Sequence, residues 1–381
     1  MPQCNRFQHQ SYSASEPTGM WGTLCPQVPA DSTPSHDAQN LSAAGQSYRS
    51  AGVQAVYLVH GTFAGNDAIG VIRGVSRIAP DFGASLRQLY KSTIDKIAGD
   101  IGNYSAEYAR RFEQIVAVPV RQFHWSSENQ HVARAHAAVC LIDELAAGDY
   151  GPNQRVLLWG HSHAGNVFAL ITNLLAAGAA VRDLFFAASR SYYRWPLGGR
   201  IDLPVWARVR QLLDAPVGTR PLPILDMVTF GTPIRYGWDT AGYAKLLHFV
   251  HHRPLPGIPV YRTALPTNPV EVLAAVGGDY VQHWGIAGTN LPPDAIAWRT
   301  WLAELKLGKL FQGGLRSRDL LKHLQAGMRV AAEGRTLLVD YGDSPQARLL
   351  AGHAVYTLVQ WLPFHVIEVA RQFYGLRSVD P

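Results

Sequence analysis

The stretch that most restricts the fold of this chain is RVLLWGHSHAGN, residues 155–166. An apolar run typical of a buried strand ends at Gly160, and an apolar pattern with helical spacing follows over residues 163–178. Ser162 lies at the junction. A serine on a sharp strand-to-helix turn needs small neighbours two positions before and two after it, and Gly160 and Ala164 satisfy this. The segment predicts a nucleophilic serine held beyond the end of a strand.

The rest of the chain repeats this alternation of strands and helices. Apolar residues make up 47% of the 381 residues and charged residues only 16%, so a large buried core is available. A final helix is expected from about 354 to 375, kinked by Pro363. The alternation predicts a mainly parallel sheet with helices on both faces. The predicted strands are 53–61, 115–125, 155–160, 224–233, 279–290 and 336–342.

The predicted organisation is a tail followed by one large domain. Residues 1–50 are rich in Ser, Gln, Pro and Asn without a regular period, which predicts a flexible tail. Residues 51–381 form the expected α/β domain. An aromatic-rich insertion around 183–223 is much longer than the usual connection of about 4–6 residues. We expect it to form a cap or lid over a pocket.

Charge and targeting signals narrow the possible partners. The net charge is +6, but the basic residues are scattered and no nucleic-acid-binding motif accompanies them, so no nucleic-acid partner is expected. Residues 1–30 lack a basic stretch followed by an apolar one, and no apolar run approaches 18 residues. These features predict a cytoplasmic protein without a transmembrane segment. The oligomeric state stays open.

Two segments supply candidate donors for a developing oxyanion. The turn after Ser162 places the backbone N–H of His163 at a helix N-terminus, where it is aimed at negative charge. The run VYLVHGTFAG ends the first strong strand and brings a second chain segment to the same edge of the sheet. We assign the second donor to Phe63, with Thr62 as the next candidate.

A nucleophilic serine also requires a general base and a carboxylate. His353, in AGHAVYT, follows the last predicted strand and is the expected base. Asp340 lies in the apolar run TLLVDYG, where a carboxylate needs a partner such as an imidazole N–H, and it is the favoured acid. Asp294 is the alternative, although PPDAIAW also makes it an obvious helix N-cap. Asp343 and Asp239 are further candidates.

Taken in order, VHGTFAG, FHWSSENQHVARA, GHSHAGN, VTFGTP and GHAVYT resemble the α/β-hydrolase superfamily, and more closely its bacterial lipase- and esterase-like serine hydrolases. The resemblance covers about residues 53–375. It implies an eight-stranded, mostly parallel sheet and cleavage of carboxylic esters by a Ser-His-Asp or Ser-His-Glu triad through an acyl-enzyme. It also implies a small-molecule or lipid-like ester substrate, no cofactor and no metal.

Carried onto this chain, the resemblance makes Ser162 the nucleophile, His353 the base, and His163 with Phe63 the oxyanion donors. The chain departs from the family pattern at two positions. Ala164 replaces the second glycine of the serine turn, and Asn290 stands where an acid might be expected. The second departure leaves the identity of the acid open.

Two other functions compete with this hypothesis. His161 and His163 are two potential ligands of a metal-dependent hydrolase, and further nitrogen ligands could come from His248, His251, His252 and His283. A metal-binding barrel would need eight evenly spaced strand–helix units, whereas about six unevenly spaced strands are identified. The histidines at 248–252 also fit an exposed helix end. The third possibility is a non-catalytic binding protein on the same scaffold.

Overall fold

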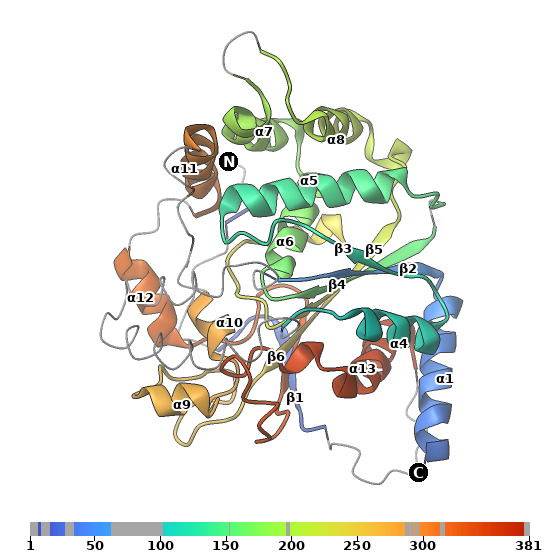
Figure 1. Ribbon diagram of the computed structural model, residues 1–381, viewed down its shortest axis with the longest axis vertical. Coiled ribbons are helices and arrows are strands. Elements are labelled where there is room, and N and C mark those ends of the chain that lie inside the picture. Colours follow the sequence, from blue (N-terminus) through green and yellow to red (C-terminus); the bar gives the residue numbers. More distant parts are fainter. Residues whose placement is uncertain are drawn as a thin grey trace.

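A computed structural model describes residues 7–8, 16–26, 34–61, 102–151, 153–195, 199–285, 290, 293, 297–312 and 317–376 (Figure 1). Its centre is a sheet of seven strands in the order β1-β7-β6-β5-β4-β2-β3. Every adjacent pair of strands is parallel. The strands are β1 (Met20–Leu24), β2 (Val53–Val59), β3 (Val120–Phe123), β4 (Arg155–His161), β5 (Ile224–Phe230), β6 (Lys245–His251) and β7 (Arg335–Val339).

Helices cover both faces of this sheet, as the sequence predicts. Figure 1 shows α5 and α6 on one side and α1, α4 and α13 on the other. No helix in the described ranges is both long and apolar enough to cross a bilayer. The helices are α1 (Pro34–Ser50), α4 (Ala106–Val116), α5 (His131–Ala147), α6 (Ala164–Ala176), α7 (Ala179–Tyr193), α8 (Pro204–Asp214), α9 (Pro269–Leu273), α10 (Tyr280–Gly285), α11 (Trp298–Gln312), α12 (Ser317–Ala326) and α13 (Leu362–Tyr374).

The central strands have apolar residues on both faces because both faces are covered. In β4, Leu158 joins the core beneath α5 and α6, whereas Leu157 and Trp159 join the core on the opposite face. All three side chains are completely buried. Such strands have continuous apolar sequences rather than an alternation of apolar and polar residues. The run VLLW could therefore be recognised as a buried strand from the sequence.

The sheet brings the ends of three strands together at one edge. In β2, Val59 pairs with Gly160 of β4, and His161 of β4 pairs with Phe230 of β5. The residues that follow these strands therefore lie side by side. Ligands of open parallel sheets bind beyond the carboxyl ends of the strands, so this edge is where a site is expected.

Four sequence predictions need correction. The expected tail at 1–50 contains β1 and α1, which pack against β7 and α13, so it is not flexible over these elements. The expected strand at 279–290 contains the short helix α10 instead. The strand β6 was missed because two histidines and a lysine interrupt its apolar pattern. The final helix begins only at Leu362, with the proline in its first turn, where it causes no kink.

The aromatic insertion contributes to the main core. It contains α7 and α8, which pack against α11 and α5 respectively and form an outer layer beyond α5 (Figure 1). Phe185, Phe186 and Trp206 are almost completely buried in the same core as the sheet. Trp206 stacks on Tyr193, with ring centroids 4.8 Å apart. These side chains hold α7 and α8 against the domain.

We expect Trp206→Ala to lower the free energy of unfolding by about 3–5 kcal/mol, because it removes a large buried side chain and leaves a cavity. Chemical denaturation of the purified protein measures this change. The control is Trp298→Ala, since Trp298 is about half exposed. If the two variants are equally stable, α8 does not belong to the cooperative core.

Candidate functional site

Ser162 occupies the sharp turn between β4 and α6, as predicted. Its backbone has a φ of 56°, a left-handed conformation that is unfavourable for a residue with a side chain. Its N–H donates to the carbonyl of Phe230 at the end of β5, with an N···O distance of 2.8 Å. The conformation is therefore held by the neighbouring strand.

Small residues are required around this turn. A Cβ atom at Gly61 would lie 2.4 Å from the Ser162 Cβ atom. A Cβ atom at Gly160 would lie 3.1 Å from the Cβ of Ala164 and even closer to the Phe168 ring. The end of β2 therefore approaches Ser162 at a distance that only glycine allows.

His353 forms a buried pair with Asp279. The distance between His353 Nδ1 and Asp279 Oδ2 is 2.8 Å, and both side chains are fully buried. Tyr356 donates its hydroxyl to the same carboxylate oxygen at 2.9 Å. The N–H of Gln282 donates to the other oxygen, Oδ1, at 2.8 Å. Both oxygens of the carboxylate thus have hydrogen-bond donors.

Asp279 carries its charge in this environment. Burial alone would raise its pKa, but the interactions with His353, the Gln282 N–H and the Arg329 guanidinium outweigh burial and lower the pKa below the ordinary value. Arg329 is itself buried and donates to the carbonyl of Asp279. Because an ionised carboxylate only accepts hydrogen bonds, Nδ1 of His353 carries a proton and Nε2 is its basic nitrogen.

His161 links Ser162 to this pair. Its ring centroid lies 4.6 Å from that of His353, and its Nε2 is 3.0 Å from the His353 carbonyl oxygen. A carbonyl can only accept, so Nε2 of His161 donates. Burial, followed by the nearby His353, lowers the pKa of His161 to about 3, so its ring is neutral.

Gly231 brings the same groups together from β5. It directly follows Phe230, which binds the Ser162 N–H, and it has a φ of 57°. A Cβ atom at this position would lie 2.6 Å from Asp279 Oδ2 and 3.1 Å from His353 Nδ1. The end of β5 therefore touches both the serine turn and the Asp279–His353 pair.

The preference for Asp340 as the partner of His353 is wrong. β7 ends at Val339, so Asp340 lies just beyond the strand, where it accepts from the Gly342 N–H and lies 3.8 Å from Arg253. The Asp340 side chain is about 29% exposed, so its carboxylate does not need an imidazole as a hydrogen-bond partner.

The other carboxylates proposed from the sequence do not replace Asp279. Asp343 pairs with Arg253 and Arg348 at the surface, and Asp239 accepts from the N–H of Ala241 in a short 3₁₀ turn. Asp294 lies outside the described residues, as do the predicted oxyanion donors Phe63 and Thr62.

His163 has the position predicted for an oxyanion donor. It precedes the first residue of α6, whose initial N–H groups have no partner within the helix. Its ring accepts from Asn166 Nδ2 at 3.2 Å, and the same amide nitrogen donates to the Pro233 carbonyl. Burial, followed by the positive charges of Arg134 and Arg235, lowers the pKa of the His163 ring well below its ordinary value.

The histidines in the described part of the chain show no arrangement for a metal. His161 contacts His353 whereas His163 contacts Asn166, so the two rings do not converge on one point. Within the described ranges, no group of three or more His, Cys, Asp or Glu side chains is placed to hold a metal ion.

The run at 248–252 is not an exposed helix end. His248 and His251 lie in β6, His252 follows it, and all three are buried. His248 accepts from the Thr229 hydroxyl at 2.6 Å and donates to the carbonyl of Glu333. His283, in α10, is also buried and donates to the carbonyl of Leu324.

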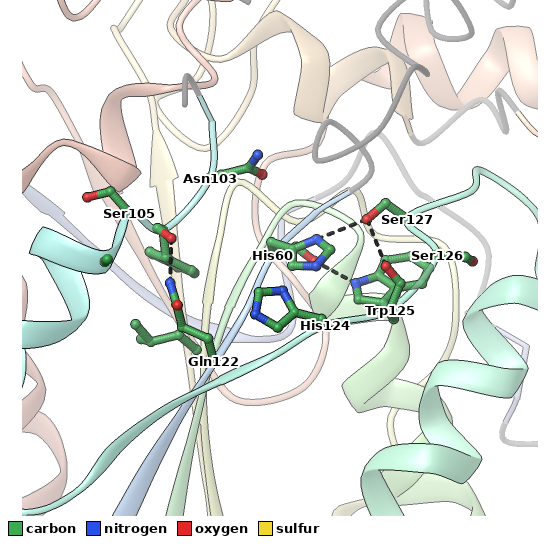
Figure 2. Close-up of a pocket in the computed structure, with 11 residues that line it drawn as sticks. His60, Asn103, Ser105, Gln122, His124, Trp125, Ser126 and Ser127 are labelled. Carbon is green, nitrogen blue, oxygen red and sulfur yellow. Dashed lines mark hydrogen bonds between the residues drawn. The ribbon is translucent and has the colours of Figure 1, made fainter. Parts of the chain in front are cut away.

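Eleven of the described residues line a cavity of about 400 Å³ (Figure 2). Its walls come from the end of β2, the start of α4 and the segment after β3. His60 lines the cavity and immediately precedes Gly61, which touches Ser162. Tyr104, on the opposite wall, has its ring 6.5 Å from that of His161. Gly61 and His161 thus lie between this lining and Ser162, which is not among the described residues that line the cavity.

Sequence reasoning missed Asp279 and its supporting Tyr356. Asp279 was placed at the start of a strand, whereas it lies in the loop between α9 and α10. The available signal was the pair Gly277-Gly278 before it, which marks a turn. In the fold this turn returns to the end of β6, where the Asp279 N–H donates to the His251 carbonyl at 2.9 Å.

Comparison with known proteins adds no assignment. No protein family matches the chain, and neither a curated protein nor a solved structure is significantly similar to it.

The buried histidines predict acid sensitivity. Burial lowers the pKa of His248 to about 4, whereas an unfolded histidine titrates near about 6.5. Between these values the unfolded chain binds the additional proton, so stability falls as pH falls. We expect His248→Gln to reduce the pH slope of the unfolding free energy by about 1.4 kcal/mol per pH unit in this window.

Denaturation curves at several pH values between 4 and 8 measure the two slopes. Above the titration range of histidine, the wild type and the variant should have parallel slopes, which serves as the internal control. Identical slopes below pH 6 would show that His248 is not neutral in the folded protein.

Proposed function

We propose that this protein is a serine hydrolase that cleaves carboxylic esters through Ser162, His353 and Asp279. The observation that carries the proposal is the fully buried His353–Asp279 pair at the sheet edge where Ser162 has a left-handed backbone. Strained backbone conformations and buried charged carboxylates both cost free energy, and their coincidence at the end of parallel strands is typical of a catalytic site.

The order of the residues along the chain supports the same proposal. The nucleophile Ser162 comes first, then Asp279 after β6, and then His353 after β7. This is the order of nucleophile, acid and histidine in α/β-hydrolases, and it differs from the orders in two other types of serine hydrolase. The seven parallel strands and the serine turn agree with this architecture, so we extend the proposal to membership of that superfamily.

The proposed reaction has two stages. Ser162 Oγ bonds to the acyl carbon while its proton moves to Nε2 of His353, and Asp279 stabilises the imidazolium. The acyl C–O bond then breaks, and the imidazolium gives the proton to the departing alcohol. Water repeats the sequence on the acyl-enzyme, which releases the carboxylic acid and restores Ser162.

Backbone donors stabilise the oxyanion in both stages. The N–H of His163 at the start of α6 is one of them, since it combines a helix N-terminus with a position adjacent to Ser162. The second donor is assigned from the sequence to Phe63 or Thr62, which follow Gly61. Removing one such donor typically costs about 3–4 kcal/mol of the barrier.

The effect on kcat should distinguish Asp279 from the other candidate carboxylates. We expect Asp279→Asn to lower kcat by about 10³- to 10⁴-fold, because an amide no longer stabilises the imidazolium or fixes its tautomer. Asp340→Asn, at a surface turn, should retain wild-type kcat. Hydrolysis of a chromogenic butyrate ester by both variants measures the difference, and equal activities would remove Asp279 from the proposed triad.

Ser162→Ala should abolish ester hydrolysis while leaving the fold intact, since only a hydroxyl is removed. Circular dichroism and the unfolding midpoint control for folding. Substantial residual turnover would contradict the proposal, and loss of wild-type activity in a chelator would instead favour the metal-dependent alternative. A folded wild-type protein that hydrolyses no ester in a panel of acyl lengths would favour a binding protein.

A further inference from the structure

Gln282 makes hydrogen bonds to two separate parts of the candidate site. It lies in α10, three residues after Asp279, and is completely buried. Its backbone N–H donates to Asp279 Oδ1, whereas its side-chain amide bonds to Arg329 and to Thr232. One residue thus contacts the acid, a buried guanidinium and the segment that follows β5.

The Arg329 guanidinium fixes the side chain of Gln282. Its Nη1 atom donates to Gln282 Oε1 at 2.5 Å and to the Asp279 carbonyl at 2.6 Å. Its Nη2 atom donates to the Gly277 carbonyl at 3.2 Å. A guanidinium can only donate, so the amide oxygen of Gln282 faces it and the amide nitrogen is left as the donor. Arg329 therefore holds both ends of the turn that carries Asp279 and sets the orientation of the amide.

Thr232 continues the connection to the nucleophile. The amide nitrogen of Gln282 donates to the Thr232 carbonyl, with an N···O distance of 3.4 Å. The Thr232 hydroxyl donates to the carbonyl of Ser162 at 2.7 Å. Thr232 also directly follows Gly231, which lies against the carboxylate–imidazole pair. Hydrogen bonds therefore run from the acid through Gln282 and Thr232 to the backbone of the serine turn.

Burying these polar groups costs free energy. Arg329 and Gln282 are both completely buried, and a charge removed from water is tolerated only when it is paired and hydrogen-bonded. Apolar residues of similar volume are often at least as stable in such places. Polar groups buried beside a candidate catalytic site point to a positioning role, because displacing a reacting group by about 1 Å can slow catalysis about 100-fold.

From these contacts we propose that Gln282 is a positioning residue of the triad. It keeps the turn that carries Asp279 aligned with the serine turn, so that the carboxylate stays opposite His353 Nδ1 while the imidazole holds the proton of Ser162. Gln282 is completely buried, so it acts through Asp279 and Thr232 and not by contact with the substrate. The inference rests on the proposed ester hydrolysis and names a residue that aligns its catalytic groups.

Gln282→Met tests this role by kinetics. Methionine has a similar length and keeps the backbone N–H that binds Asp279, but its side chain cannot replace the hydrogen bonds to Arg329 and Thr232. We expect kcat for a chromogenic butyrate ester to fall by about ten-fold, the effect of losing one hydrogen bond to a charged group. KM should not change, because the side chain does not reach the substrate.

The matched control is Asn173→Leu. Asn173 is also a buried amide, in α6, and it donates to the carbonyls of Ala169 and Gly237. Its replacement should lower the free energy of unfolding and leave kcat unchanged. Titration with a fluorophosphonate corrects kcat for the active fraction of each protein. A corrected kcat of Gln282→Met equal to that of the wild type would show that Gln282 supports stability alone, and the proposal would be wrong.

Thr232→Val tests the connection even if Gln282→Met does not fold. Valine has the shape of threonine but no hydroxyl to donate to Ser162, and Thr232→Ser restores the hydroxyl. We expect kcat to fall by about five-fold in Thr232→Val and to recover in Thr232→Ser. The combined loss in the double variant with Gln282→Met should be smaller than the product of the two single losses, because both changes break one connection. Wild-type kcat in Thr232→Val, or fully multiplicative losses, would overturn the proposal.

An NMR measurement separates this proposal from the hydrolase. The proton between His353 Nδ1 and Asp279 should give a downfield signal without substrate, identified by its loss in Asp279→Asn. We expect this proton to exchange with water faster in Gln282→Met and at the wild-type rate in Asn173→Leu. Faster exchange in a protein that hydrolyses no ester would refute the hydrolase and keep the aligning role of Gln282. Unchanged exchange in a protein that hydrolyses esters would keep the hydrolase and refute that role.

Discussion

The buried, hydrogen-bonded pair of Asp279 and His353 determines the arrangement of the whole site. A carboxylate removed from water is tolerated only when it is paired and hydrogen-bonded. Asp279 satisfies this condition with the imidazole of His353, the hydroxyl of Tyr356 and the N–H of Gln282. These groups come from the segments after β6 and after β7, so the pair joins two loops at one edge of the sheet.

The same edge imposes a second constraint, which is steric. Ser162 can keep its left-handed backbone because Phe230 binds its N–H and because Gly61 leaves room beside it. Any side chain at Gly231 would collide with Asp279 and His353, and one at Gly61 would collide with Ser162. The ends of β2, β4 and β5 thus meet only because glycine follows two of these strands.

Local sequence patterns predicted the parts of the structure that depend on local interactions. The strand, turn and helix around Ser162 are encoded within about twenty residues, and the structure confirms them. The sequence also singled out His353 as the candidate base, because it follows a strongly apolar strand, and the structure pairs it with Asp279. The partner of His353 was not predictable in the same way, since Asp279 is 74 residues away and their contact depends on the order of strands in the sheet.

Each of the remaining errors has its own physical cause. β6 contains buried histidines that are neutral and hydrogen-bonded, so an apolar environment tolerates them although they resemble a polar surface in the sequence. Asp340 resembled a buried acid because its neighbours are apolar, but the strand ends one residue earlier. β1 and α1 have weak patterns of their own and are stabilised by β7 and α13.

Mass-spectrometric mapping of a fluorophosphonate adduct tests the central claim most directly. Such a reagent reacts with a serine only when a neighbouring base activates it and an oxyanion site accepts the phosphoryl oxygen. The account predicts one adduct per chain, on the peptide containing Ser162, and no adduct after the protein is unfolded. An adduct on a different residue, or an unmodified Ser162 in a protein that hydrolyses esters, would contradict it.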